Sequence, residues 1–183
     1  MTSRISQVAK SLSLLVLLAL TLNSAGVAQD SAAATSTFFA EFQAFEAQVG
    51  DRMIALAKAI PAERYTWRPA SGVRSVSEVL MHIAAANFGS AKAVGAPMPA
   101  DLPQDLSKVT RKDEVLALLE SSYRLARGAA KNLATMDLSQ PLPGGSGMSL
   151  RASLFGFVEH QAEHLGQLIA YARGLGVTPP WSR

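Results

Sequence analysis

The sequence predicts an all-α fold, a four-helix bundle preceded by a cleavable signal peptide. The first observation is that apolar residues recur every three or four positions in each of four long segments, which is typical of amphipathic helices. The second is that loops containing proline and glycine separate these segments, and no stretch alternates apolar and polar residues as a strand would. Long helices with one apolar face bury it against one another, which predicts a bundle.

Residues 1–28 are typical of a secretory signal peptide. Arg4 and Lys10 precede an apolar run over residues 12–22, and small residues follow up to Ala28. The run is about half the length that spans a bilayer. We expect cleavage after Ala28, with Ala25 and Gly26 as near alternatives, although an uncleaved anchor remains the competing interpretation. The expected product is an exported domain over residues 29–183, periplasmic or extracellular, without stable membrane insertion.

The first helix of this domain is expected over residues 36–60. Its predicted buried stripe consists of apolar residues at helical spacing: Phe38, Phe42, Phe45, Val49, Met53, Leu56 and Ile60. Pro61 ends it. Ser75 followed by Glu78 fits a capping box, which starts the second helix and predicts that it continues to about Val94.

The third helix is expected to begin after Thr110, with Asp113 as its capping partner, and to fade near Met136. The fourth is expected from about Ser149 to Arg173, where Gly174 is a natural stop. Its predicted inward face also carries two of the chain's three histidines: Leu150, Leu154, Phe157, His160, His164, Leu168 and Tyr171.

Composition excludes several classes of function. The formal charge of +3 falls to near neutral once Arg4 and Lys10 leave with the signal peptide, and no Lys/Arg cluster follows any predicted helix. We therefore expect no nucleic-acid partner. The chain has no cysteine, which excludes disulfides, thiolate ligands and a cysteine nucleophile.

The histidines indicate a metal site. His160 and His164 lie four residues apart, so a helix places them on one face, and His82 lies on the predicted second helix. Three neutral imidazoles can provide three ligands of a tetrahedral divalent metal and leave one position open. The alternative is that these are core histidines satisfied by hydrogen bonds, and spacing alone leaves the two interpretations evenly matched.

The string His160-Gln161-Ala162-Glu163-His164 also matches the H-x-x-E-H pattern of some zinc proteases. That pattern requires a further carboxylate ligand downstream, and no Asp or Glu follows His164, so we reject the protease interpretation. Glu163 remains a candidate catalytic base, although it lies about 100° around the helix from His164 and a solvent-facing position is favoured. Gln167 and Tyr171 are candidates for orienting a ligand or substrate.

The sequence resembles the DinB-like (DinB/YfiT-like) superfamily of four-helix metalloproteins over nearly the whole predicted mature chain. The resemblance rests on several strings, of which that containing the histidine pair is the strongest: Tyr65 to Pro69, Ser75 to His82, His160 to Gln167, Tyr171 to Gly176 and Pro179 to Trp181. Family members often have another histidine at the position of Glu163, which weakens any acid–base role transferred from that position.

The resemblance implies a bundle with two crossover connections, often a homodimer, and a metal site at one end formed here by His82, His160 and His164. It implies zinc or nickel as the ion, and either a hydrolase or a thiol-dependent S-transferase as the activity. An exported protein fits the thiol-dependent reaction less well, because small thiols are chiefly cytosolic. The alternative is a non-catalytic metal-binding or stress-related envelope protein.

Overall fold

The computed structural model describes residues 33–142 and 147–182, and the predicted signal peptide lies outside them. The chain divides into two compact units, residues 1–39 and 40–183. Of the first unit, the described residues 33–39 are helical. The regular secondary structure in the described part of the second unit is helical; it contains an isolated bridge between Pro141 and Ser149 and no strand. The predicted fold class is therefore confirmed for the described residues.

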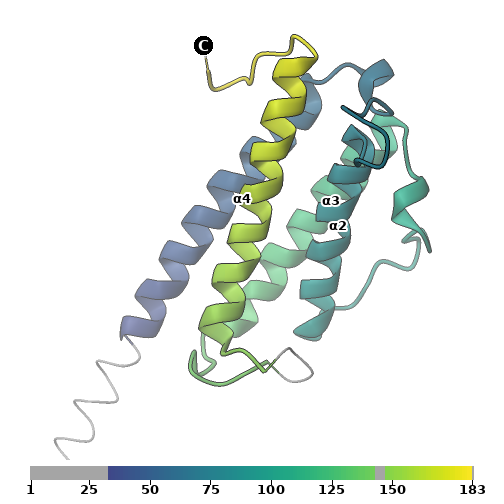
Figure 1. Ribbon diagram of the computed structural model, residues 1–183. Coiled ribbons are helices and arrows are strands. Elements are labelled where there is room, and N and C mark those ends of the chain that lie inside the picture. Colours follow the sequence, from purple (N-terminus) through teal and green to yellow (C-terminus); the bar gives the residue numbers. More distant parts are fainter. Residues whose placement is uncertain (1–32, 143–146, 183) are drawn as a thin grey trace, which may run out of the picture. The chain divides into compact units, whose positions relative to one another are not determined.

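Four long helices form the second unit (Figure 1). The first covers residues 40–59 of this unit and is followed by α2 (Val76–Ala93), α3 (Lys112–Ala130) and α4 (Leu150–Gly174). Three short 3-10 helices lie in the connections: η1 (Ala62–Arg64), η2 (Leu106–Lys108) and η3 (Lys131–Leu133).

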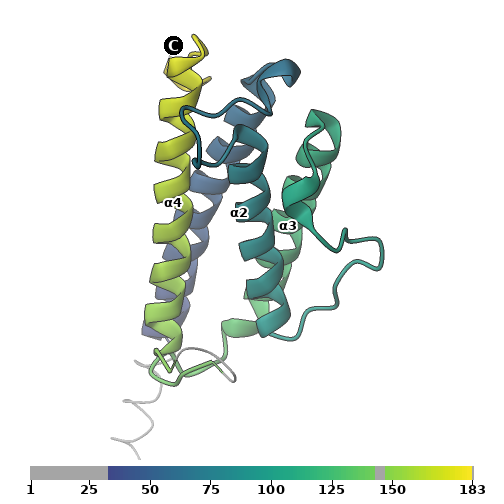
Figure 2. The ribbon, with the colours of Figure 1, turned by 45° about the vertical axis from the view of Figure 1, so that its right-hand side comes forward.

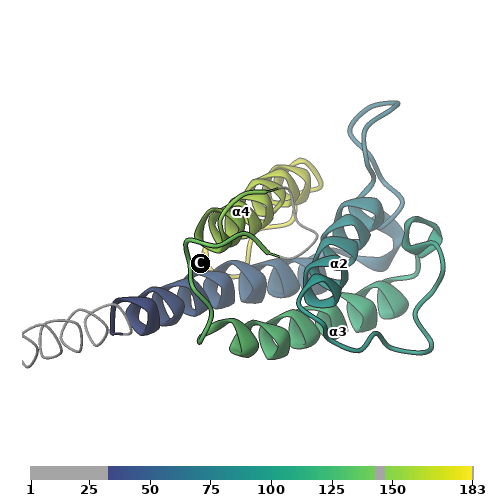
Figure 3. The ribbon, with the colours of Figure 1, turned by 90° about the horizontal axis from the view of Figure 1, so that it is seen from below.

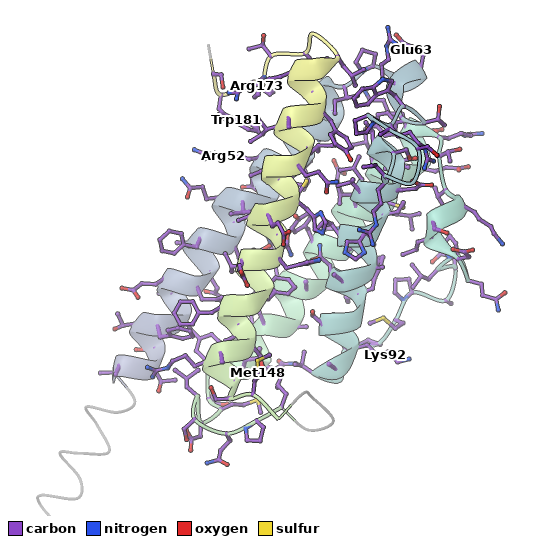
Figure 4. The ribbon with its side chains drawn as sticks, in the orientation of Figure 1. Arg52, Glu63, Lys92, Met148, Arg173 and Trp181 are labelled. Carbon is purple, nitrogen blue, oxygen red and sulfur yellow. The ribbon has the colours of Figure 1, made fainter. Side chains whose placement is uncertain are left out.

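The helix directions differ from those implied by the family resemblance. The Tyr65 hydroxyl donates to the Ala57 carbonyl and Lys112 donates to the Ile60 carbonyl, so α2 and α3 both begin where the first helix ends. Glu63 and Arg173 lie at this end of the bundle and Lys92 and Met148 at the other (Figure 4).

Only the connection over residues 94–111 therefore runs along the length of the bundle, giving one crossover where two were expected. It passes outside the helices (Figures 2 and 3), and η2 within it packs against α2. The reason is that α2 and α3 are parallel, whereas the other two connections join antiparallel helices at a single end.

The start of α2 is as predicted. The Ser75 hydroxyl accepts from the Glu78 backbone N–H, and the Glu78 carboxylate accepts from the Ser75 N–H at 2.7 Å, which is a complete capping box. The predicted box at Thr110 is wrong. α3 begins one residue later than expected, with Arg111 as N-cap, and Asp113 forms an ion pair with the Arg111 guanidinium.

The other predicted ends need small corrections. α3 stops at Ala130 and gives way to η3, which continues to Leu133. Gly174 is the last residue of α4, not its stop: the backbone reverses at Gly176, where φ is +75°, a conformation that glycine adopts without a steric penalty.

The predicted buried stripe of the first helix is confirmed at Phe42, Met53, Leu56 and Ile60 and is wrong at Phe45. Phe45 was expected in the core but is 61% exposed, whereas Glu46 is only 7% exposed. Arg127 of α3 makes this possible, because its Nε donates to Glu46 Oε2 at 2.9 Å. Glu46 Oε1 has no hydrogen-bond partner among the described residues.

We predict that Glu46 makes stability depend on pH. Burial raises the pKa of this carboxyl above its ordinary value of 4.5, although Arg127 lowers it in part. The folded state therefore holds a proton that the unfolded state has already lost, so stability falls as pH rises through this window. Glu46→Gln should remove that slope and be more stable than wild type at neutral pH. Denaturant titrations at several pH values, with the exposed Glu41→Gln as control, check this; parallel pH profiles for wild type and Glu46→Gln would contradict it.

Gly50 permits a close approach between the first helix and α3. A Cβ at this position would lie 2.6 Å from Tyr123 Cε1 and 2.8 Å from Arg127 Nη2. We expect Gly50→Ala to destabilise the protein by about 1–3 kcal/mol through this clash. That sign opposes the helix propensity of alanine, which is about 1 kcal/mol better than that of glycine.

Gly89 in α2 is the matched control, because a Cβ there meets nothing within 4 Å. Gly89→Ala should stabilise the protein by up to about 1 kcal/mol. Urea unfolding of both variants measures the two effects. Stabilisation of equal size at both positions would show that the approach at Gly50 is not tight.

None of the described helices combines the length and apolar character needed to cross a bilayer.

Candidate metal centre

The three histidines come together between two helices. His82 lies in the second turn of α2, and His160 and His164 lie in the middle turns of α4. Their ring centroids are 4.7–5.0 Å apart. Each offers a ring nitrogen, and these nitrogens all lie within 4.8 Å of one another. The cluster therefore forms as the sequence predicted, although midway along α4 and not at the end of the bundle.

His164 has the most defined orientation. Its Nδ1 lies 2.8 Å from Gln167 Oε1, Gln167 Nε2 donates to the Tyr171 hydroxyl at 2.9 Å, and that hydroxyl donates to the Arg74 carbonyl at 3.1 Å. Because Gln167 Oε1 is an acceptor, this hydrogen bond requires a proton on His164 Nδ1, and the neutral tautomer that has it leaves the lone pair on Nε2. Gln167 and Tyr171 thus act as the predicted orienting groups for a ring nitrogen.

His82 and His160 make direct contact. Their Nε2 atoms lie 3.0 Å apart, so one ring donates and the other accepts. Burial lowers the pKa of His82, and the positive charge of Arg74 lowers it further. Burial also lowers the pKa of His160, followed by the neighbouring His164, whereas Glu163 acts in the opposite direction. Both shifts favour neutral imidazoles, which is the form that coordinates metals.

These residues fit a divalent ion. Three neutral imidazoles are the donor set of open zinc sites, and imidazole also suits nickel. The hydrogen bond from His164 to Gln167 is the kind of outer contact that fixes a coordinating ring. The cluster is the one group of three or more His, Cys, Asp or Glu side chains with suitable spacing in residues 33–142 and 147–182.

Glu163 lies on the exposed face of α4. It is not part of the metal-compatible cluster, and no hydrogen bond joins it to a histidine in the described structure. Its charge reaches His160 but its carboxylate has no defined contact with the cluster. This position agrees with the solvent-facing placement that the sequence favoured.

Sequence reasoning missed a buried polar network beside the cluster. Gln161 Nε2 donates to Asn87 Oδ1 at 2.6 Å, and Gln161 Oε1 accepts from the Tyr123 hydroxyl. Asn87 Nδ2 donates to the Ser122 hydroxyl at 3.1 Å, and that hydroxyl donates to the Leu119 carbonyl. The network joins α2, α3 and α4 one residue from His160, and each of its side chains is at most 2% exposed.

A cleft gives access to His82. It has a volume of about 530 Å³ and lies between one face of α2 and the loop over residues 102–107. Its walls combine apolar and polar side chains: Arg74, Glu78, Met81, His82, Ala85, Phe88, Leu102, Pro103, Gln104, Asp105, Leu106 and Ser107. A small molecule in this cleft would therefore meet the cluster at His82, whereas His160 and His164 are not among the lining residues.

Comparison with models of protein families identifies the family of this chain. The model of the DinB family matches residues 32–183, which include all three histidines, the cleft and the polar network. Among curated proteins, none matches the chain. The family match confirms the resemblance found in the sequence.

Proposed function

Because this chain belongs to the DinB family, we propose that it is a metal-dependent enzyme in which His82, His160 and His164 hold a divalent ion, zinc or nickel. The reaction that we propose is hydrolysis of a small molecule with a carbonyl-type carbon. The observation that best supports this proposal is that one member of the histidine cluster, His82, also lines an open cleft. A purely structural ion would have no need of such access.

The residues of this chain would have separate roles in the reaction. The three imidazoles would hold the ion, and the hydrogen bonds of Gln167 to His164 and Tyr171 would keep the His164 ring in a fixed orientation. When bound, a divalent ion supplies Lewis acidity that polarises a carbonyl group and lowers the pKa of water. The apolar side chains of the cleft, among them Met81 and Phe88, would hold the substrate and exclude bulk water.

The choice of hydrolysis over thiol transfer depends on a second proposal, that residues 1–28 direct export. An exported enzyme would work away from the small cytosolic thiols that an S-transferase needs, whereas water is available everywhere. N-terminal sequencing of the protein recovered outside the cytoplasm should begin at Gln29. Recovery of the intact chain from the cytoplasm alone would contradict export and restore thiol transfer as an equal candidate.

The test of the enzyme proposal is turnover of a panel of aryl esters and amides by zinc-loaded and chelated protein. Activity should require the metal and should be lost in His82→Ala, with the fold checked by circular dichroism. Lys92→Ala, an exposed position on the same helix, is the control. Glu163→Gln in the same panel shows whether that exposed carboxylate takes part. Tight metal binding with no turnover in any member of the panel would favour the non-catalytic metal-binding protein.

A further inference from the structure

The cleft beside His82 contains two carboxylates, and both already have donors. Glu78 accepts from the Ser75 backbone N–H at 2.7 Å and from Arg68 Nη2 at 3.0 Å. Asp105 accepts from the Ser107 N–H at 3.0 Å and from the Ser107 hydroxyl at 2.6 Å, and it pairs with Lys108 at 3.3 Å. Each carboxylate is therefore already paired with one cation, Arg68 or Lys108, and neither ion pair includes the remaining cation of the cleft.

Arg74 is that remaining cation. Its side chain lines the same cleft as His82, and its positive charge lowers the pKa values of both His82 and His160. In the described part of the chain, no carboxylate lies within ion-pair distance of its guanidinium. Its backbone is fixed independently, because its carbonyl accepts from the Tyr171 hydroxyl at 3.1 Å.

The proposed metal would increase the positive charge on this side of the cluster. Neutral imidazoles cancel none of the charge of a divalent ion, so both positive charges remain. Glu159 and Glu163 are exposed on α4 and raise the pKa of His160, but they do not line the cleft. A group entering the cleft would thus meet the Arg74 guanidinium and, at His82, the charge of the proposed ion, whereas each carboxylate of the cleft already has a cationic partner.

We infer that the substrate carries an oxyanion, a carboxylate or a phosphate, and that Arg74 binds it while the reacting group lies at the metal. The guanidinium presents two parallel N–H donors that match either oxyanion, and such pairs are stronger than neutral hydrogen bonds. This inference rests on the proposed function, and it adds the substrate class and a residue that selects it.

The test uses hydroxamates, which bind zinc through one end and present a second group at the other. Calorimetry of the zinc-loaded protein compares succinic monohydroxamic acid with butyrohydroxamic acid, which has a methyl group in place of the carboxylate. Phosphonoacetohydroxamic acid provides the phosphate arm. We expect at least one anionic probe to bind about tenfold more tightly than butyrohydroxamic acid. The arm that shows the preference identifies the oxyanion.

The preference should disappear in Arg74→Gln and return in part in Arg74→Lys, which restores the charge without the planar fork. Arg124→Gln, an exposed arginine on α3, should behave as wild type. Equal affinity for all three probes, or a preference that persists in Arg74→Gln, would overturn the role of Arg74 while leaving the metal centre intact. Failure of every hydroxamate to bind more tightly with zinc than without it would instead overturn the metal centre and the inference together.

Discussion

His160→Ala should abolish stoichiometric zinc binding, whereas wild type should retain one ion per chain after dialysis. His160 provides one of three histidine ring nitrogens that lie within 4.8 Å of one another. Its removal leaves two ligand atoms, which are too few for a structural or catalytic zinc site. Changes to groups that only support a ligand already cost about 10–100-fold in affinity, so loss of a ligand itself should cost at least that much.

Thermal unfolding provides the second measurement of the same prediction. Free zinc at about one hundred times its dissociation constant should stabilise wild type by about 2.7 kcal/mol. For a domain of this size that corresponds to a rise of roughly 5–10 °C in Tm. His160→Ala should show little of this rise.

The quantity to compare is the increment that zinc produces, because the metal-free variants differ for other reasons. His160→Ala loses the contact between its Nε2 and that of His82, and it also relieves the burial of one imidazole. Glu159→Gln, on the exposed face of the same helix, should keep the full increment. Equal melting of wild type with and without every divalent ion would mean that the histidines serve only the fold.

Gln161→Leu should destabilise the fold by about 2–4 kcal/mol, although leucine is of similar size and apolar. The substitution leaves Asn87 Oδ1 and the Tyr123 hydroxyl without their partner in a region where neither reaches water. Each buried polar group left unpaired costs about 1–3 kcal/mol. Denaturant unfolding with an unchanged slope measures the loss directly.

A double-mutant cycle separates this explanation from a packing defect. Adding Tyr123→Phe to Gln161→Leu removes one of the orphaned groups, so the second substitution should cost less in the Gln161→Leu background than in wild type. Gln48→Leu, at an exposed position of the first helix, should change stability by less than about 0.5 kcal/mol. Strictly additive effects of Tyr123→Phe and Gln161→Leu would show that the network is not a coupled unit.

The features that the sequence predicted well are those that depend on local spacing. The separation between His160 and His164 determines a shared helix face, and the Ser75–Glu78 pair determines where α2 begins, whatever surrounds them. His82 could be assigned to the same site because the chain has no other histidine to compete with it.

The features that it missed depend on a partner from another helix. Glu46 and Gln161 have side chains that usually face water, and only Arg127 in the first case and Asn87 with Tyr123 in the second make their burial tolerable. Phe45 was placed in the core because it is apolar and fits the helical spacing, whereas the neighbouring Glu46 takes the buried position.

The cleft and the single crossover were also beyond local reasoning. The path of residues 94–111 depends on α2 and α3 being parallel, and no motif in the loop specifies that direction. The burial of Gln161 could have been predicted, because it follows His160 immediately and lies at the edge of the helix face that was assigned to the interior. A polar side chain at such a position needs buried hydrogen-bond partners.

The Tyr171 hydroxyl has a consequence for how this protein can diversify. It accepts a hydrogen bond from Gln167, the residue that orients the His164 ring, and it donates a hydrogen bond to the backbone carbonyl of Arg74. If the proposed roles of His164 and Arg74 hold, mutation at position 171 would disturb both metal binding and anion binding, so natural variation in substrate preference should avoid this position. The loop over residues 102–107 borders the cleft, and relatives that act on different compounds should diverge there first.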